Sequence, residues 1–123
     1  MNQTENPLNW RVIKDINDFN LQDIKKGIVF IFAAWSGPSR IAFNNLTHLL
    51  TSFDLSSVDV FVLDNDFDLS GELWIRMFGH VFHGAGETLW IRNGKVVAEA
   101  SAFNPDSKSK ILDNTRNLLN HID

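Results

Sequence analysis

The stretch Phe30-Ile31-Phe32-Ala33-Ala34-Trp35-Ser36-Gly37-Pro38-Ser39-Arg40 decides the fold, because an apolar run ends there in a Gly-Pro turn and a helical pattern follows at once. We expect a buried strand that leads through a tight corner into a helix. The Ser36 hydroxyl can cap this helix, and Pro38 has the backbone angle of a first helical turn, where its missing N–H costs nothing. The corner therefore presents free backbone N–H groups beside Trp35.

The segments on both sides of this corner have the periodicities of two strands and a helix. Residues 28–33 form a continuous β-branched and aromatic run, which is typical of a strand covered on both faces. Residues 58–63 predict another strand, parallel to the first and joined to it by a right-handed crossover. Between the two strands, apolar residues at helical spacing predict a long helix with one apolar stripe: Ala42, Leu46, Leu49, Leu50 and Phe53.

The N-terminal part of the chain predicts three short elements before the central strand. Residues 1–9 are polar, and we expect a flexible terminus. Residues 10–14 predict a short strand that is parallel to the strand over residues 58–63. Residues 15–27 contain capping residues, a short apolar pattern and the stop Lys25-Lys26-Gly27, which predict a short amphipathic helix. Gly27 is expected to let the chain turn into the central strand.

The C-terminal half predicts a helix, a hairpin and a final helix. Residues 69–78 have a helical pattern, and residues 79–86 form a loop rich in glycine and histidine. Residues 87–91 and 95–100 predict antiparallel strands, because the Asn-Gly pair between them tolerates the positive φ angles of a tight turn. The cap Asn104-Pro105-Asp106 predicts a last helix with one apolar face. The expected order is βαβαβαββα, an α/β fold with a central mixed sheet flanked by helices.

Composition narrows the class of protein. The chain has 123 residues, of which 44% are hydrophobic, so residues 10–123 are expected to form a single domain with its own core. A net charge of −4 disfavours binding to nucleic acid, which requires clustered Lys and Arg. No apolar run is long enough for a membrane span and no signal segment is recognisable, so we expect a cytoplasmic protein without a membrane partner.

The corner and the order of elements resemble those of the thioredoxin-like family, and the resemblance covers nearly the whole chain. That family carries an aromatic-Ala-x-Trp sequence followed by Cys-Gly-Pro-Cys-Arg, and this chain has Trp35-Ser36-Gly37-Pro38-Ser39-Arg40 at the same spacing. The resemblance implies a thioredoxin-like fold. In the family the two cysteines exchange disulfides through a thiolate at the helix N-terminus. Ser36 and Ser39 occupy both positions, so these degenerate redox positions contribute no catalytic residue.

Two further positions depart from the family pattern. The family's buried Asp, five residues before the Trp, is matched by Phe30, which cannot handle protons. The family's cis-proline is matched by Gly86, preceded by Ala85, and we expect a trans bond there because a cis bond without proline costs about 3 kcal/mol. The stretch from Asp64 to Gly86 is also longer than in compact family members. These departures favour a naturally redox-inactive protein over a Cys-to-Ser variant of an active oxidoreductase.

The functional prediction is a redox-inactive protein-binding module without a cofactor. The resemblance places a Trp at the surface of the corner, where it contacts partners. We therefore expect another protein, or an extended peptide segment, to bind at Trp35, Ser36, Gly37, Pro38, Ala85 and Gly86. One alternative is a thiol-disulfide oxidoreductase, a thioredoxin acting in cell redox homeostasis, seen as its Ser-Gly-Pro-Ser (SGPS) variant. The other is a structural subunit with no peptide groove, and the oligomeric state stays open.

Other candidate sites are weaker. His80, His83 and Glu87 offer metal ligands, but no helix fixes the histidines on one face, so we expect a turn-forming loop and no metal. The alternating aspartates from Asp64 to Asp68 lack the glycine and the distal glutamate of a calcium loop. Ser36 as a nucleophile would need a base that the sequence does not place beside it, so helix capping is the favoured role.

Overall fold

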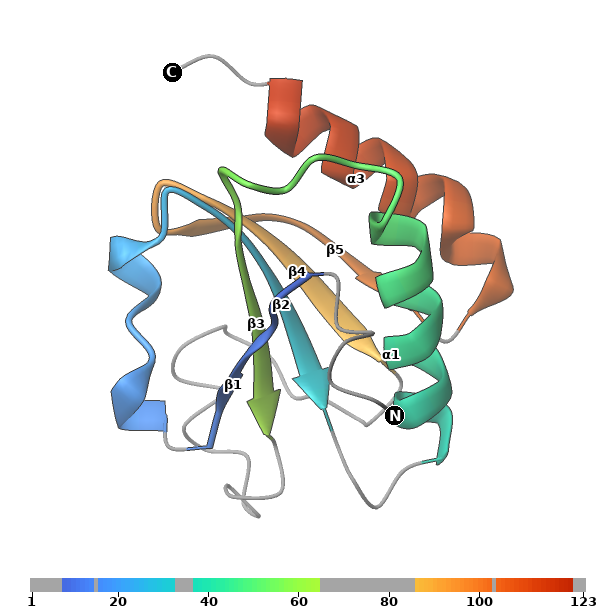
Figure 1. Cartoon of the computed structure of the whole chain (residues 1–123), viewed down its shortest axis with the longest axis horizontal. Helices are drawn as coiled ribbons and strands as arrows, with labels where there is room; N and C mark the ends of the chain where they lie inside the picture. The colour runs from blue at the N-terminus through green and yellow to red at the C-terminus, as the bar shows by residue number, and fades with distance from the viewer. Residues whose placement is uncertain (1–7, 15, 33–36, 65–85, 103, 121–123) are drawn as a thin grey trace.

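One mixed sheet forms the centre of the molecule (Figure 1). The computed structural model describes residues 8–14, 16–32, 37–64, 86–102 and 104–120 of the chain. Within them, five strands lie in the order β1-β3-β2-β4-β5. Their bounds are β1 (Arg11–Ile13), β2 (Lys26–Phe32), β3 (Asp59–Asp64), β4 (Glu87–Arg92) and β5 (Lys95–Ser101). β3 is parallel to β1 and β2, whereas β4 is antiparallel to β2 and β5. The predicted strands and their directions are therefore confirmed.

Two helices, α1 (Gly37–Leu50) and α3 (Lys108–Asn120), lie on the same side of this sheet (Figure 1). The predicted apolar stripe of α1 is present: Ala42, Leu46 and Leu50 are fully buried, although the helix ends before Phe53. Asn104 begins the last helical segment through its side-chain oxygen, which accepts a hydrogen bond from the Asp106 N–H at 2.9 Å. A single 3-10 turn, η5 (Pro105–Ser107), then leads into α3.

The core under these helices contains a buried polar contact between β4 and α3. The Trp90 indole Nε1–H donates to the Thr115 hydroxyl at 3.1 Å, and that hydroxyl donates to the Ile111 carbonyl at 2.8 Å. Trp90 and Thr115 are both fully buried. Because an unpaired buried donor is costly, this chain of hydrogen bonds fixes α3 on β4. The surrounding cluster is apolar and includes Ile28, Phe30, Val60, Val62, Leu46, Leu50, Ile111 and Leu118.

The helix predicted over residues 15–27 is wrong. The described part of this segment forms two 3-10 turns, η2 (Ile16–Asp18) and η3 (Leu21–Asp23), on the opposite side of the sheet from α1 and α3 (Figure 1). Asn20 caps η3 by accepting a hydrogen bond from the Gln22 N–H at 3.1 Å. So short a segment makes too few hydrogen bonds to offset the cost of starting an α-helix. The chain enters β2 at Lys26, so Gly27 lies inside the strand and not in a turn.

The hairpin between β4 and β5 forms as the sequence predicts. Asn93 and Gly94 connect the strands with φ angles of 51° and 77°. One residue of β5 lies outside the pairing register, because Trp90 pairs with Ala98 whereas Ile91 pairs with Val96. This bulge twists an edge strand away from edge-to-edge pairing.

Several predicted elements lie outside the described residues, namely the helix over residues 69–78, the loop up to Ala85 and the flexible terminus up to Pro7. No helix among the described residues is both long and apolar enough to cross a membrane.

Candidate functional site

The predicted corner lies where β2 ends and α1 begins. β2 ends at Phe32 and α1 begins at Gly37, so the chain turns from strand to helix within the stretch that the sequence indicates. Trp35 and Ser36 lie outside the described residues. Pro38 and Ser39 belong to the first turn of α1 through their backbone. A methyl group on Gly37 would meet nothing within 4 Å, so the start of this helix faces open space.

Gly86 is also predicted to belong to this corner. The pairing of β2 with β4 reaches Phe30 and Thr88, and Gly86 precedes Thr88 by two residues. Gly86 is buried and has a φ of 74°, a conformation that favours glycine. Its carbonyl accepts hydrogen bonds from the Ala102 N–H at 2.9 Å and from the Thr88 hydroxyl at 3.0 Å. Gly86 thus directly precedes β4, the strand that pairs with β2, and is held there by Ala102 and Thr88. Ala85, and with it the expected trans bond, lies outside the described residues.

Aromatic side chains fill the space below the corner. Phe30 is fully buried, and its ring centroid lies 5.3 Å from that of Phe43 and 6.3 Å from that of Phe32. Trp10 contacts Phe43 from the other side, with ring centroids 5.3 Å apart. A carboxylate in this cluster would lose its hydration without gaining a charged partner. The cluster therefore packs the end of β2 against α1, and these phenylalanine rings contain no group that could take up a proton.

A hollow between the two helices was not predicted from the sequence. It has a volume of about 230 Å³ and lies between α1, the start of α3 and Ala102, whose N–H binds Gly86. Its floor is apolar, while amide, imidazole and ammonium groups surround it; the lining consists of Asn45, His48, Leu49, Ala102, Asn104, Lys108 and Ile111. Only Asn104 gave a local signal, as a helix cap. The other residues come from segments far apart in the chain, and no spacing in the sequence shows that they meet.

Comparisons of sequence and of structure with known proteins give different results. No protein-family model matches the sequence, and no curated protein matches it either. Solved structures do match. Thioredoxin from Trypanosoma brucei brucei aligns with a TM-score of 0.69 and 11% identity, covering 98% of this chain and 100% of that one. For Malassezia sympodialis thioredoxin (Mala s 13) the TM-score is 0.65 at 14% identity, with 86% and 90% of the two chains covered.

A third match carries the highest identity of the three. The germline-specific thioredoxin Deadhead from Drosophila melanogaster aligns with a TM-score of 0.63 and 20% identity over 87% of this chain and 97% of that one. The chain has the thioredoxin fold. A thioredoxin fold does not by itself specify an activity, because the same fold accepts different sites. What this chain does must therefore be argued from the residues at its corner.

Those residues differ from a redox-active thioredoxin site in their chemistry. The chain contains no cysteine, so it has no thiolate to attack a disulfide and no second thiol to resolve the product. The position predicted to match the family's buried acid is Phe30, which is packed between other rings. The chain therefore has the thioredoxin fold but lacks the two cysteines of a redox-active site.

The residues considered as possible metal ligands are mostly outside the described part of the chain. His80 and His83 lie outside the described residues, as do Asp66 and Asp68, so the expectation that they hold no metal stays a prediction. Within the part of the chain that the structure describes, no three His, Asp or Glu side chains form a group that could hold a metal ion.

Proposed function

We propose that this chain is a redox-inactive thioredoxin-like protein that binds another protein through the corner formed by Trp35, Ser36, Gly37 and Pro38, together with Ala85 and Gly86. The observation that carries the proposal is a nearly full-length thioredoxin fold in a chain without cysteine. Serine at both redox positions provides neither a thiolate nor an activated nucleophile. The corner can therefore bind another protein but cannot exchange disulfides with it.

The backbone at the corner supplies polar groups for such binding. The first N–H groups of a helix have no partner within the helix, and those of α1 begin at Gly37, which faces open space. An extended segment of a partner protein can offer carbonyl groups to them. Trp35 adds a large side chain of the type that dominates the affinity of many interfaces.

The alternative of a thiol-disulfide oxidoreductase requires more than two lost sulfur atoms. The fully buried Phe30 occupies the position predicted for the family's acid, and Gly86 adopts a φ of 74° at the position predicted for its cis-proline. Proline has a φ near −65° and cannot adopt this conformation. These differences favour a protein that is naturally redox-inactive. They do not favour an active oxidoreductase in which only the two cysteines were replaced by serine.

A capture experiment tests the proposal. The tagged chain is used to isolate partners from its own cell lysate, and each candidate is then purified and measured directly against the wild type and Trp35→Ala. Loss of a hot-spot Trp typically weakens binding by 2 kcal/mol or more, so we expect an increase in Kd of about 30-fold. Far-ultraviolet circular dichroism should show an unchanged fold.

The matched control is Val12→Ala on the edge strand β1. Val12 is also an exposed hydrophobic residue, with 58% of its surface accessible, but it does not belong to the corner. Its replacement should leave the Kd unchanged. Equal affinity of the wild type and Trp35→Ala for every partner would exclude the corner as the binding surface, and equal weakening by Val12→Ala would show that the effect is not specific to it.

A further inference from the structure

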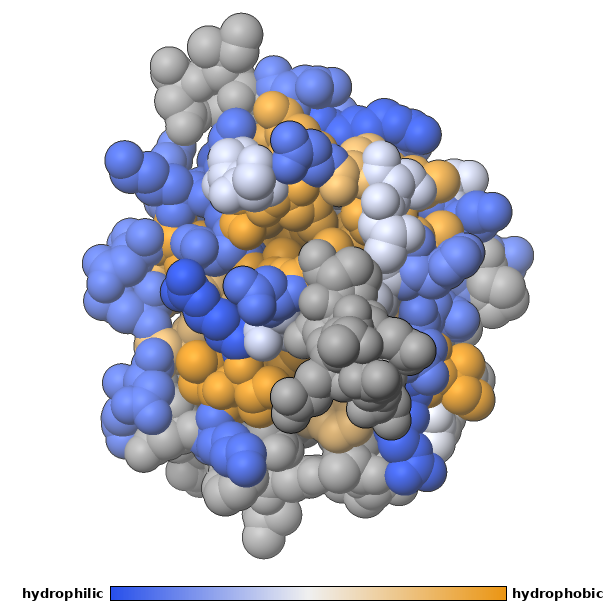
Figure 2. Space-filling view, viewed as in Figure 1, coloured by the Kyte–Doolittle hydropathy of each residue, from blue (hydrophilic) through white to orange (hydrophobic). Residues whose placement is uncertain are grey.

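A second site lies at the amino ends of β1 and β3, at the opposite end of these parallel strands from the corner. A cleft of about 460 Å³ is present there between the start of β1 and the connection from α1 to β3. Figure 2 shows hydrophobic surface at this place, edged by hydrophilic side chains. The volume is within the range of pockets that bind small molecules, about 300 to 1,000 Å³.

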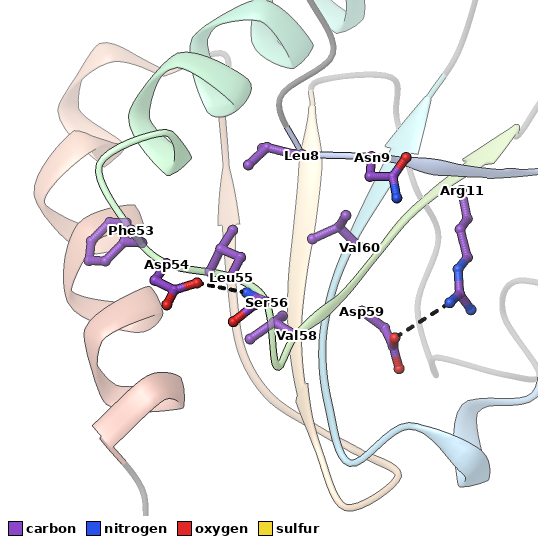
Figure 3. A pocket seen from close by; sticks show the side chains of 10 residues that line it. All are labelled: Leu8, Asn9, Arg11, Phe53, Asp54, Leu55, Ser56, Val58, Asp59 and Val60. Carbon is purple, nitrogen blue, oxygen red and sulfur yellow. Dashed lines mark hydrogen bonds and ion pairs between the residues drawn. The ribbon is translucent and has the colours of Figure 1, made fainter.

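The cleft has apolar side chains at its base, while most of its lining surface is polar or charged. Figure 3 shows Leu55, Val58 and Val60 between the Asp54 carboxylate at one end and the ion pair of Arg11 and Asp59 at the other. Val58 and Val60 are almost fully buried, so they form a firm floor. An aliphatic stem can lie along this floor and bury its own surface against it.

The charges at the ends favour a cation over an anion. Two carboxylates, those of Asp54 and Asp59, line the cleft, but only one guanidinium, that of Arg11, does so. This guanidinium lies 3.9 Å from Asp59 and 5.8 Å from the centroid of the Phe61 ring, so two neighbouring groups already hold it. The net charge of −4 adds a field that attracts cations to the whole molecule.

Asp54 is the carboxylate best placed to receive a positive group. Its Oδ1 accepts a hydrogen bond from the Ser56 N–H at 3.1 Å, and the carboxylate is exposed, so it can accept a further hydrogen bond from a ligand. This backbone hydrogen bond, and a weaker one from the Ser56 side chain, lower the pKa of Asp54, so it stays ionised at neutral pH. No basic side chain among the described residues forms an ion pair with it.

We propose that this cleft binds an ammonium group on an aliphatic stem, with the ammonium at Asp54 and the stem on Leu55, Val58 and Val60. A second ammonium at the far end is received by Asp59. Such a group occurs in small aliphatic diamines and in the lysine side chain of another protein. The two sources share this chemistry and are separated by the choice of probe.

Titration of the ¹⁵N-labelled full chain at constant ionic strength tests the proposal. The probes are 1,5-diaminopentane, pentylamine and pentanoate, which share a five-carbon chain and differ in charge. We expect saturable shifts of the Val58 and Val60 amides with the amines, about two- to fivefold tighter for the diamine because of a second exposed ion pair, and none with pentanoate. The absence of saturable shifts, or equal shifts with pentanoate, would overturn the proposal.

Two variants provide the matched comparison. Asp54→Asn keeps an oxygen for the Ser56 N–H but removes the charge, and it should weaken diamine binding about two- to fivefold. Asp113→Asn removes an exposed carboxylate on α3 that is paired with Arg116 at 3.1 Å, and it should change nothing. Equal effects of the two variants would show that the amines respond only to net charge.

The same titration with Nα-acetyl-lysine amide distinguishes the sources. Tighter binding of the free diamine indicates a small amine as the ligand, whereas equal or tighter binding of the capped lysine indicates a side chain of another protein. Both results retain an ammonium group on an aliphatic stem as the occupant. Failure of both probes, with the corner still binding its partner, would remove this inference and leave the proposed function untouched.

Discussion

The two ends of the central strand β2 differ in how tightly they are held. At its start, the hairpin turn is attached to the strand: the Asn93 N–H donates to the Lys25 carbonyl and the Gly94 N–H to the Ile24 carbonyl, both at 2.8 Å. At its other end, α1 begins at a glycine that faces open space. We call the first the locked end and the second the corner end.

This difference separates stability from binding. At the locked end, close contacts leave no room for additional atoms, because a methyl group on Gly27 would come within 2.5 Å of Ile24 Cγ2. At the corner end, we propose that backbone groups bind another molecule, and the rings of Phe30 and Phe32 pack against Phe43 of α1. A substitution at the locked end should therefore reduce stability, and one on the surface of the corner end should leave it unchanged.

The largest effect is expected for Phe30→Asp, which places the family's acid below the corner. Replacing a fully buried phenylalanine by a small residue costs about 3 to 5 kcal/mol, and the carboxyl adds a desolvation cost. Burial should raise the pKa of the introduced carboxyl in the folded state. The loss of stability is then smallest below the ordinary carboxyl pKa of about 4 and grows as the pH rises towards 7. Urea denaturation at several pH values measures it.

Phe30→Leu is the control for this prediction. It keeps the site apolar and should cost less than about 1.5 kcal/mol, with no dependence on pH beyond that of the wild type. A Phe30→Asp variant as stable as Phe30→Leu at neutral pH would mean that the corner still accepts a carboxylate. Proton transfer at a restored pair of cysteines would then need fewer changes to the chain than we propose.

The next effect is expected for Gly27→Ala at the locked end. Its methyl group would overlap with Ile24 and lie 3.4 Å from the Asp59 carbonyl oxygen. Overpacking of this kind typically costs about 1 to 3 kcal/mol. The free energy of unfolding in urea measures the loss. Gly27→Ala should cost about as much in an Ile24→Val background, which keeps the crowding methyl group, but less in an Ile24→Ala background, which removes it.

A smaller loss is expected for Gly94→Ala in the hairpin turn. Gly94 has a φ of 77°, and an L-residue other than glycine pays about 1 to 2 kcal/mol in that region. The new methyl group would also lie 3.1 Å from Gln22 Cα. Asn93→Gly serves as the control, since its φ of 51° suits glycine. A fully stable Gly94→Ala variant would show that the turn is not what locks this end.

The smallest effect, of opposite sign, is expected for Gly37→Ala at the corner end. The methyl group meets nothing within 4 Å, and the loss of freedom in the unfolded chain should add up to about 1 kcal/mol of stability. Thermal unfolding beside the wild type is sufficient to detect it. A clear loss of stability would contradict the difference between the two ends.

Much of the fold could be predicted from short stretches of the sequence. The Asn93-Gly94 turn, the apolar stripe of α1 and the parallel strands are each specified by neighbouring residues, and all are present. That Gly86 joins the corner in one surface stays a prediction, because Trp35, Ser36 and Ala85 lie outside the described residues. The helix predicted over residues 15–27 failed because capping residues and a stop do not compensate for so few apolar contacts.

The sites outside the corner had no signal in the sequence. Asp54 and Arg11 are far apart in the chain and line one cleft only because β3 pairs with β1. His48 and Lys108 likewise line one hollow because α1 and α3 lie on the same side of the sheet. Such neighbours result from long-range strand pairing and helix packing, which periodicity and turn residues do not reveal.

The most direct test restores both sulfur atoms. The double variant Ser36→Cys and Ser39→Cys is assayed for insulin reduction beside an active thioredoxin. Without a buried acid below the corner, proton transfer lacks the assistance that typically contributes about a hundredfold or more, so we predict turnover at least about a hundredfold below that of the active protein. Turnover equal to that of thioredoxin would contradict the proposal and identify the chain as an oxidoreductase lacking only its two cysteines.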